Sequence, residues 1–194
     1  MNTTNNNVQD VISLVEGSFK VNKVEVVDQY QVSFEVEKNE VHALLSILKS
    51  KGWIQLSYLS AVDWIDENQF ELVYIVFNWE KPVYIQVRTR LDRDNPVMNT
   101  IMPIYEGCKY YEREACEFFG IKFPGNPDYD KQLILEEWDD MPPLRKDFDP
   151  QAYSDKKFTV REYSETHVQV KGESQQEKRA NRKARIDAVI GGKK

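Results

Sequence analysis

"QFELVYIVFNWEKPVYIQVRTR", residues 69–90, decides the fold, because it places two strand patterns on either side of a short turn. After Glu71 the first run is apolar at successive positions, as in a strand that is covered on both faces. The second run alternates, so that one face carries Val83, Ile85 and Val87 and the other carries polar side chains. The intervening "WEKP" is typical of a hairpin turn, which pairs the two strands antiparallel.

Upstream residues extend this pattern. Apolar residues from Val8 to Val15 recur with helical spacing and predict a helix that ends near Gly17. Residues 24–37 alternate as one half-buried strand, with Tyr30, Val32, Phe34 and Val36 facing the core.

A second helix is expected next, capped by Asn39 and ended by Gly52. Residues 54–64 then alternate as a further strand, joined to residues 69–78 by the turn "DENQ". The predicted fold class is therefore α+β: a mostly antiparallel sheet of about four strands packed with two or three helices, followed by an extended C-terminal arm.

The helix predicted from about Lys109 to Gly120, "KYYEREACEFFG", concentrates ionisable groups. Its apolar stripe comprises Tyr111, Ala115, Phe118 and Phe119, and Glu112 lies at the border of that stripe. Arg113 and Glu117 are spaced i, i+4 on the opposite side, next to Glu114. Three interpretations follow from the residues alone: acid–base chemistry, a solvated face with a weak ion pair, or charges that pair with a partner protein.

The sequence divides into three parts. Residues 1–123 form the predicted α+β domain, residues 124–150 a proline-rich docking arm, and residues 151–194 a polar basic tail with a helix expected over 174–190. Residues 1–150 carry 26 acids and 15 bases, a net of −11, whereas residues 151–194 carry 6 acids and 11 bases, a net of +5. Only the tail would attract an anionic partner.

No catalytic, cofactor-binding or metal-binding residues are predicted. Cys108 and Cys116 lie eight apart, without the spacing of zinc or iron–sulfur ligands, and His42 and His167 have no ligand-spaced neighbours. Phosphate-binding glycine motifs are absent from the sequence. No apolar run reaches the roughly 18–20 residues that span a bilayer, and the start lacks a secretory pattern. A cytoplasmic or peripherally membrane-associated protein is the expectation.

"YYEREACEFFGIKFPGNPD", followed by "LILEEW" and "PPLRKDF", resembles the motif of the C-subunit family of respiratory complex I (NADH–quinone oxidoreductase), and the resemblance covers residues 30–150. The matched positions are Tyr110, Glu112, Arg113, Glu114, Glu117, Phe119, Gly120, Ile121, Phe123, Gly125, Pro127, Asp128, Trp138, Pro143, Leu144, Arg145, Lys146 and Asp147. Tyr110 and Asn126 stand where the family has Trp and His, which favours a divergent relative of archaeal or hydrogenase type.

The resemblance implies a noncatalytic structural subunit in the peripheral arm of an ion-translocating membrane oxidoreductase, on the cytoplasmic side of the membrane. It would dock on the large D subunit, which is homologous to the nickel–iron hydrogenase large subunit, and neighbouring subunits would hold the iron–sulfur clusters. The interface residues expected from the resemblance are Glu112, Arg113, Glu114, Asp128, Trp138, Arg145, Lys146 and Asp147.

Three alternatives remain open. The protein is the equivalent subunit of a membrane-bound nickel–iron hydrogenase, or a stand-alone adaptor whose basic tail binds nucleic acid, or an enzyme that uses Cys116 and a nearby carboxylate. Co-purifying subunits distinguish the first, salt-sensitive binding the second, and loss of activity on Cys116→Ser the third.

Overall fold

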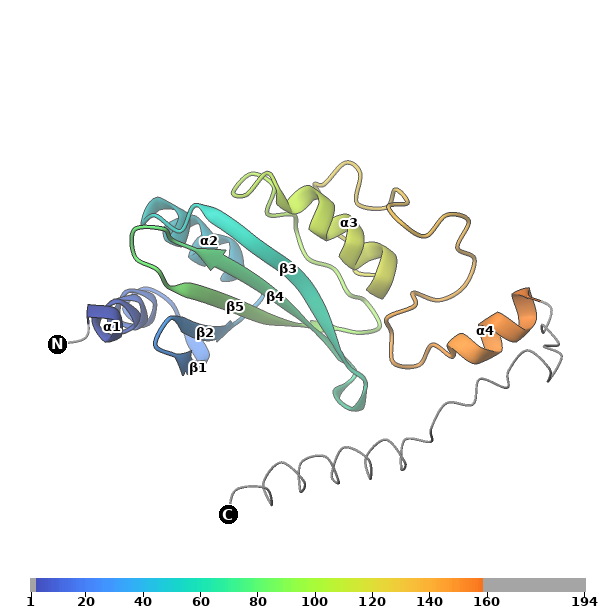
Figure 1. Cartoon of the computed structure of the whole chain (residues 1–194), viewed down its shortest axis with the longest axis horizontal. Coiled ribbons are helices and arrows are strands. Elements are labelled where there is room, and N and C mark those ends of the chain that lie inside the picture. Colours follow the sequence, from blue (N-terminus) through green and yellow to red (C-terminus); the bar gives the residue numbers. More distant parts are fainter. Residues whose placement is uncertain (1–2, 159–194) are drawn as a thin grey trace, which may run out of the picture. The chain divides into compact units, whose positions relative to one another are not determined.

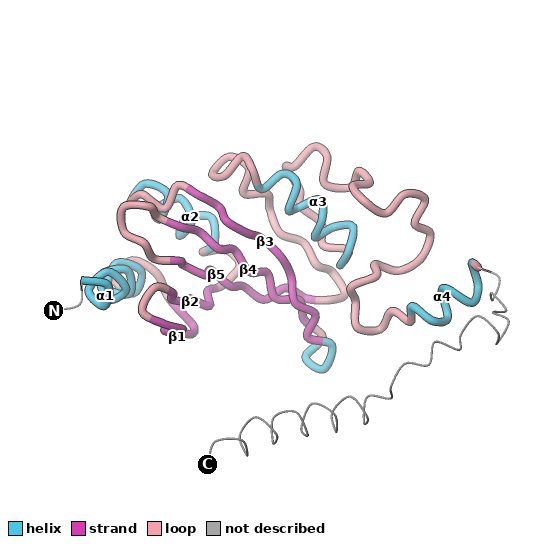
Figure 2. Tube along the Cα trace, in the orientation of Figure 1, coloured by secondary structure: helices cyan, strands magenta, loops and turns pink. Residues whose placement is uncertain are grey.

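The computed structural model describes residues 3–158, with side chains from Asn7 onward. Figures 1 and 2 show how the elements follow one another along the sequence. Their bounds are α1 Thr3–Glu16, β1 Val21–Asp28, β2 Gln31–Val36, α2 Val41–Ser50, β3 Gln55–Trp64, the 3₁₀ turn Ile65–Glu67, β4 Gln69–Phe77, β5 Tyr84–Asp92, α3 Cys108–Phe119 and α4 Pro150–Lys157.

The strands form one sheet in the order β1-β2-β5-β4-β3. The β1–β2, β3–β4 and β4–β5 pairs are antiparallel, whereas β2 pairs with β5 in parallel, with Val32 opposite Ile85. The α+β class and the mostly antiparallel sheet are confirmed, with five strands in place of the expected four.

The fifth strand arises where a single strand over residues 24–37 was predicted. The backbone turns back between Asp28 and Gln31, and the Asp28 carboxylate accepts the Tyr30 amide at 2.7 Å, which closes an Asx turn. Tyr30 therefore lies in the turn, 42% exposed, and not on the buried face of a strand. Val32 and Phe34 face the core as expected.

The core lies between the sheet and the helices on one of its faces. Figure 1 shows α2 behind the sheet, and its Leu44, Leu45 and Leu48 are fully buried. The alternation predicted for β5 is confirmed, because Ile85 and Val87 are fully buried while the intervening residues are not. Burial of these apolar side chains supplies the main driving force for the fold.

Two details differ from the sequence pattern. Helix α2 begins one residue later than an Asn39 cap requires, with Glu40 in the flanking position and no side-chain cap bond. In β3 the side chains that face the core are Leu59, Ala61 and Asp63. The apolar residues Tyr58, Val62 and Trp64, whose alternation predicts this strand, lie on its more exposed face. A register irregularity between Leu56 and Tyr58 lies near the start of that strand.

Helix α3 matches the prediction closely and ends at Gly120, which adopts a left-handed conformation with φ +80°. Residues 124–149 contain no helix or strand. The described residues divide into two units after Pro150, and beyond this point only the remainder of α4 and Phe158 are described. The predicted helix over residues 174–190 lies outside the described residues.

Candidate partner-docking site

Helix α3 is the platform of the site. Phe119 packs edge-on against Phe70 of the sheet at a ring-centroid distance of 6.0 Å, and Tyr111 packs edge-on against Tyr58 at 5.8 Å. The Tyr111 hydroxyl also donates to the Ser57 carbonyl at 3.3 Å. These contacts fix the apolar side of α3 to the sheet and turn its charged side toward the arm, the irregular segment 124–149.

Glu112 lies inside the protein, although it was expected at a partner interface. Its side chain is fully buried, and its carboxylate accepts the Thr100 hydroxyl at 2.7 Å, the Ile101 amide at 2.9 Å and the Asn126 side-chain amide at 2.8 Å. The Cys108 thiol approaches it at 3.2 Å. Because the donors come from three segments, Glu112 joins α3 to the loop before it and to the start of the arm.

The Thr100 loop has a second attachment, to α2. The His42 ring Nε2 lies 2.9 Å from the Thr100 carbonyl, which can only accept, so this nitrogen donates. His42 is partly buried and fixes the loop that Glu112 also holds. Gly125 packs against the same loop: its φ is +95°, and a Cβ placed on it would lie 2.7 Å from the Thr100 Cγ2 atom.

Arg113 and Glu117 hold the arm. The Arg113 guanidinium donates to the Gln132 carbonyl at 2.6 Å, and the Glu117 carboxylate accepts the amides of Leu133, Ile134 and Leu135 at 2.8, 3.0 and 3.1 Å. Three successive amides pointing at one carboxylate form an anion-binding concavity. One of the three interpretations of the sequence paired Arg113 with Glu117. Among the described residues these two groups instead bond to the arm backbone.

Asp128 ties the start of the arm to α3. Its carboxylate lies 2.5 Å from the ammonium groups of both Lys109 and Lys131. Hydrogen bonds from these two lysines lower the pKa of Asp128 to about 2. Asp128 therefore stays ionised at neutral pH, and the pair is partly exposed, so its contribution to stability is modest.

A second anchor holds the end of the arm against the sheet. Arg93 forms a bidentate pair with Asp63 at 2.9 and 3.1 Å and also contacts Asp147 at 2.6 Å. Asp63 additionally accepts the Lys146 amide at 2.8 Å. The Arg145 guanidinium lies over the Phe70 ring at 5.3 Å from its centroid.

The charges of this anchor stabilise one another. Burial alone would raise the pKa of Asp63, but the hydrogen bonds from Arg93 and the Lys146 amide outweigh it, and the pKa is lowered. The hydrogen bond from Arg93 likewise lowers the pKa of Asp147. Breaking such a pair would leave an uncompensated charge in a buried place, which is strongly destabilising.

The predicted interface residues thus fall into two clusters. Glu112, Arg113 and Asp128 gather around α3, whereas Arg145, Lys146 and Asp147 gather around Arg93 and Asp63, which were not singled out from the sequence. Glu114 is half-buried on α3. Trp138 folds the arm on itself, because its indole N–H donates to the Met141 carbonyl at 2.9 Å and its ring packs against Phe148 at 5.5 Å.

The two cysteines are poor nucleophiles. Cys108 is fully buried, and burial followed by the nearby Glu112 raises its pKa well above the ordinary value. Cys116 is half-buried, and burial raises its pKa to about 11. The thiolate, which is the reactive form, is therefore scarce at neutral pH in both residues.

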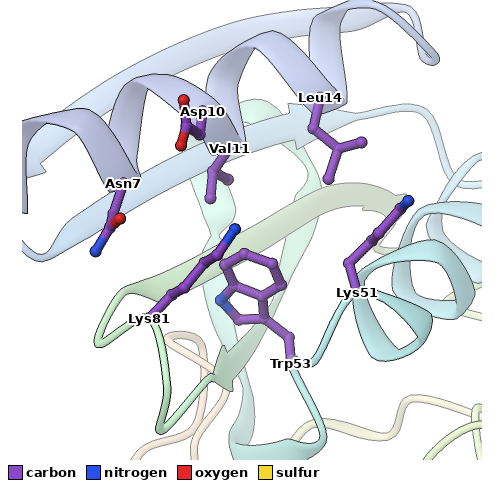
Figure 3. Close-up of a pocket in the computed structure, with 7 residues that line it drawn as sticks. All are labelled: Asn7, Asp10, Val11, Leu14, Lys51, Trp53 and Lys81. Atoms are coloured by element: carbon purple, nitrogen blue, oxygen red, sulfur yellow. The ribbon is translucent and has the colours of Figure 1, made fainter.

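A small pocket lies elsewhere, between α1 and the loops after α2 and β4. Its volume is about 300 Å³. Figure 3 shows Lys51 and Lys81 on either side of Trp53, facing α1. The other lining residues are Asn7, Asp10, Val11 and Leu14. The Trp53 indole N–H donates to the Val83 carbonyl at 3.0 Å, so its polar atom is already used.

Residues 3–158 contain no group of three or more His, Cys, Asp or Glu side chains placed to hold a metal ion. None of the helices described in that range is long and apolar enough to cross a membrane.

Comparisons with known proteins agree with the motif. The family model for the 30 kDa subunit of the respiratory-chain NADH dehydrogenase matches residues 34–154. The C subunit of the F(420)H(2) dehydrogenase of Methanosarcina mazei is 29% identical over 149 residues, covering 72% of this chain and 90% of its own. The C/D subunit of the NADH-quinone oxidoreductase of Bdellovibrio bacteriovorus is 31% identical over 149 residues, covering 74% of this chain and 26% of that longer one.

Among solved structures, a chain of the membrane-bound sulfane sulfur reductase, an archaeal respiratory membrane complex, superposes with a TM-score of 0.75. It is 30% identical, and the match covers 82% of this chain and 95% of that one. The resemblance seen in the sequence motif is thereby confirmed. The chain belongs to the 30 kDa subunit family of the respiratory-chain NADH dehydrogenase, the C-subunit family of complex I-like oxidoreductases.

Proposed function

We propose that this protein is a noncatalytic structural subunit of the peripheral arm of an ion-translocating, complex I-like oxidoreductase, and that it docks on the hydrogenase-like large subunit of D type. The observation that carries this proposal is the relative from Bdellovibrio bacteriovorus, whose name joins C and D in a single longer chain. Fusion keeps two parts at equal number and close together, which suits subunits that bind each other.

The chemistry of the signature residues supports a structural role. Hydrogen bonds to this chain's own backbone and side chains engage the charged groups of Glu112, Arg113 and Glu117. An acid–base catalyst needs a group that can reach a substrate proton, and these groups are already engaged. The iron–sulfur clusters of the complex would be held by neighbouring subunits.

The place of the protein follows from the same proposal. It would lie on the cytoplasmic side of the membrane and reach the membrane only through the complex. Residues 1–150 carry a net charge of −11 and would be repelled by an anionic bilayer, which supports attachment of this part of the chain through a protein contact.

A second candidate is the equivalent subunit of a hydrogenase-type or sulfur-reducing archaeal complex. The similarity to the sulfane sulfur reductase chain, which spans 95% of that chain, favours it. Both candidates place the protein beside a large subunit of the same type, and they differ in the electron donor and acceptor, which belong to other subunits.

Affinity purification of the tagged full-length protein from native membranes tests the proposal. We expect a hydrogenase-like large subunit and iron–sulfur subunits in equal amounts with the tagged protein, identified by mass spectrometry. The electron-input subunit in the same sample would distinguish the two candidates. Recovery of the tagged protein alone, or with nucleic acid, would contradict the proposal.

A further inference from the structure

We propose that the surface with which this protein meets its large subunit is an apolar ridge on the arm, formed by Ile134, Met141 and Leu144, and that the partner offers an apolar groove with a basic rim. This inference rests on the proposed function and adds the contact itself. It also differs from the expectation that the charged signature residues make the contact.

The ridge is exposed although its side chains are apolar. Ile134 is 62% exposed, Leu144 53% and Met141 39%. Single exposed apolar residues are ordinary, but these three belong to one irregular segment of 11 residues, 134–144, and protein contacts commonly bury exposed apolar side chains of this kind.

The backbone of the ridge is held in place. The Ile134 amide donates to Glu117, and the Leu144 amide donates to the Phe118 carbonyl at 3.0 Å, so both are fixed to the last turn of α3. Figure 1 shows the arm passing alongside α3. The Met141 amide donates to the Asp140 carboxylate at 2.7 Å, and the Met141 carbonyl accepts the Trp138 indole N–H. A surface that is ordered before binding loses less entropy on association.

One residue between the ridge positions has an unusual backbone. Glu137 adopts φ 54°, in the left-handed region that residues other than glycine rarely occupy. Such outliers cluster at functional segments, where surrounding contacts impose a conformation that the residue alone would avoid. Glu137 and its neighbour Glu136 are both exposed.

The charge around the ridge selects the partner. Residues 128–147, which include all three ridge positions, carry seven acids and three bases, a net of −4, and one of the bases, Lys131, pairs with Asp128. A second copy of this protein would bring acids against acids, and an anionic lipid surface would be repelled in the same way. The complementary surface is therefore a protein groove rimmed by lysine or arginine.

The open face of the sheet is a weaker candidate. It also exposes apolar side chains, among them Trp64 at 37%. Its charges, however, pair within the sheet, because Arg88 contacts Glu25 and Arg90 contacts Glu67, each at 3.3 Å. Such a face carries little net charge with which to choose a partner.

The test compares tagged full-length variants in native membranes by the amount of D-type large subunit that co-purifies. We expect the double variant Ile134→Asp, Leu144→Asp to reduce this recovery at least tenfold, and Glu136→Lys with Glu137→Lys to reduce it severalfold. Val27→Asp is the matched control: Val27 is 51% exposed on β1, and its variant should recover the large subunit within twofold of wild type. All variants should unfold at the wild-type urea midpoint, because the changed side chains are exposed.

The outcomes separate the two proposals. If wild type recovers the large subunit and the aspartate and lysine double variants recover it equally well, docking through the arm ridge is overturned and the proposed function stays intact. A wild-type protein that recovers no D-type subunit would instead overturn the proposed function. If the first variant alone fails to fold, the charge-reversal variant decides, since it removes no apolar contact.

Discussion

Replacing Glu112 by alanine should remove the hydrogen bonds that join α3 to the Thr100 loop and to the start of the arm, and so destabilise the fold. The carboxylate accepts three protein donors in a fully buried position, the Thr100 hydroxyl and the amides of Ile101 and Asn126. Each buried donor left without a partner costs about 1–3 kcal/mol. Because the Thr100 hydroxyl can turn elsewhere, we expect a loss of about 4 kcal/mol in the free energy of unfolding, from a typical total of about 5–15 kcal/mol.

Urea unfolding of the purified full-length protein, followed by tryptophan fluorescence, measures this loss. With a slope of about 2 kcal/mol per molar urea, the midpoint should fall by about 2 M. Glu112→Gln should lose about half as much, because its carbonyl oxygen still accepts one donor while its amide group faces the others.

Glu114→Ala is the control, since Glu114 is the same residue type on the same helix but only half-buried. Its free energy of unfolding should change by about 0.5 kcal/mol or less. If Glu112→Ala unfolds within about 1 kcal/mol of wild type, the buried carboxylate does not organise these segments, and the reasoning is refuted.

Three further predictions concern the same segments. Gly125→Ala should destabilise the fold by about 1–3 kcal/mol in urea unfolding, because φ is positive and the new Cβ would meet the loop, whereas Gly107→Ala, with nothing within 4 Å, should change it little. The pKa of Asp63 is lower in the folded state than in the unfolded state, so its pair with Arg93 stabilises the fold above about pH 4. This stabilisation is lost as the pH falls through the folded pKa. Asp63→Asn should therefore lower the urea midpoint at neutral pH and make that midpoint depend less on acid pH. Glu117→Gln weakens charge-assisted bonds to the arm, and tryptic cleavage within the arm should become roughly tenfold faster, while an unchanged cleavage rate would mean that other contacts hold it.

The strands and helices were predictable because their patterns are local. The sequence of β5 alternates and that of β4 is apolar on both faces, and the burial of side chains in the two strands follows these patterns. The β1–β2 hairpin was missed because its turn is so short that the period-two pattern of apolar residues runs through it without a break. Only the Asx turn at Asp28, closed by a hydrogen bond two residues on, marks the reversal.

The sequence predicted which residues make up the site, but not which groups their side chains bond to. The helical projection placed Arg113 and Glu117 on the outward face of α3, which is where they lie, but their partners are backbone groups near residue 132 that leave no mark in the sequence. The Arg93–Asp63 pair joins residues 30 apart and depends on strand register. Glu112 at the border of the apolar stripe was the one local sign of a buried carboxylate.

The most direct test of how this protein docks is site-specific photo-cross-linking in the native complex. A photoreactive phenylalanine analogue is placed at Ile134 and, for comparison, at Val27, and the cross-linked partners are identified by mass spectrometry. We expect the D-type large subunit to be captured from position 134 and not from position 27. Capture of that subunit from position 27, with none from position 134, would contradict docking through the arm.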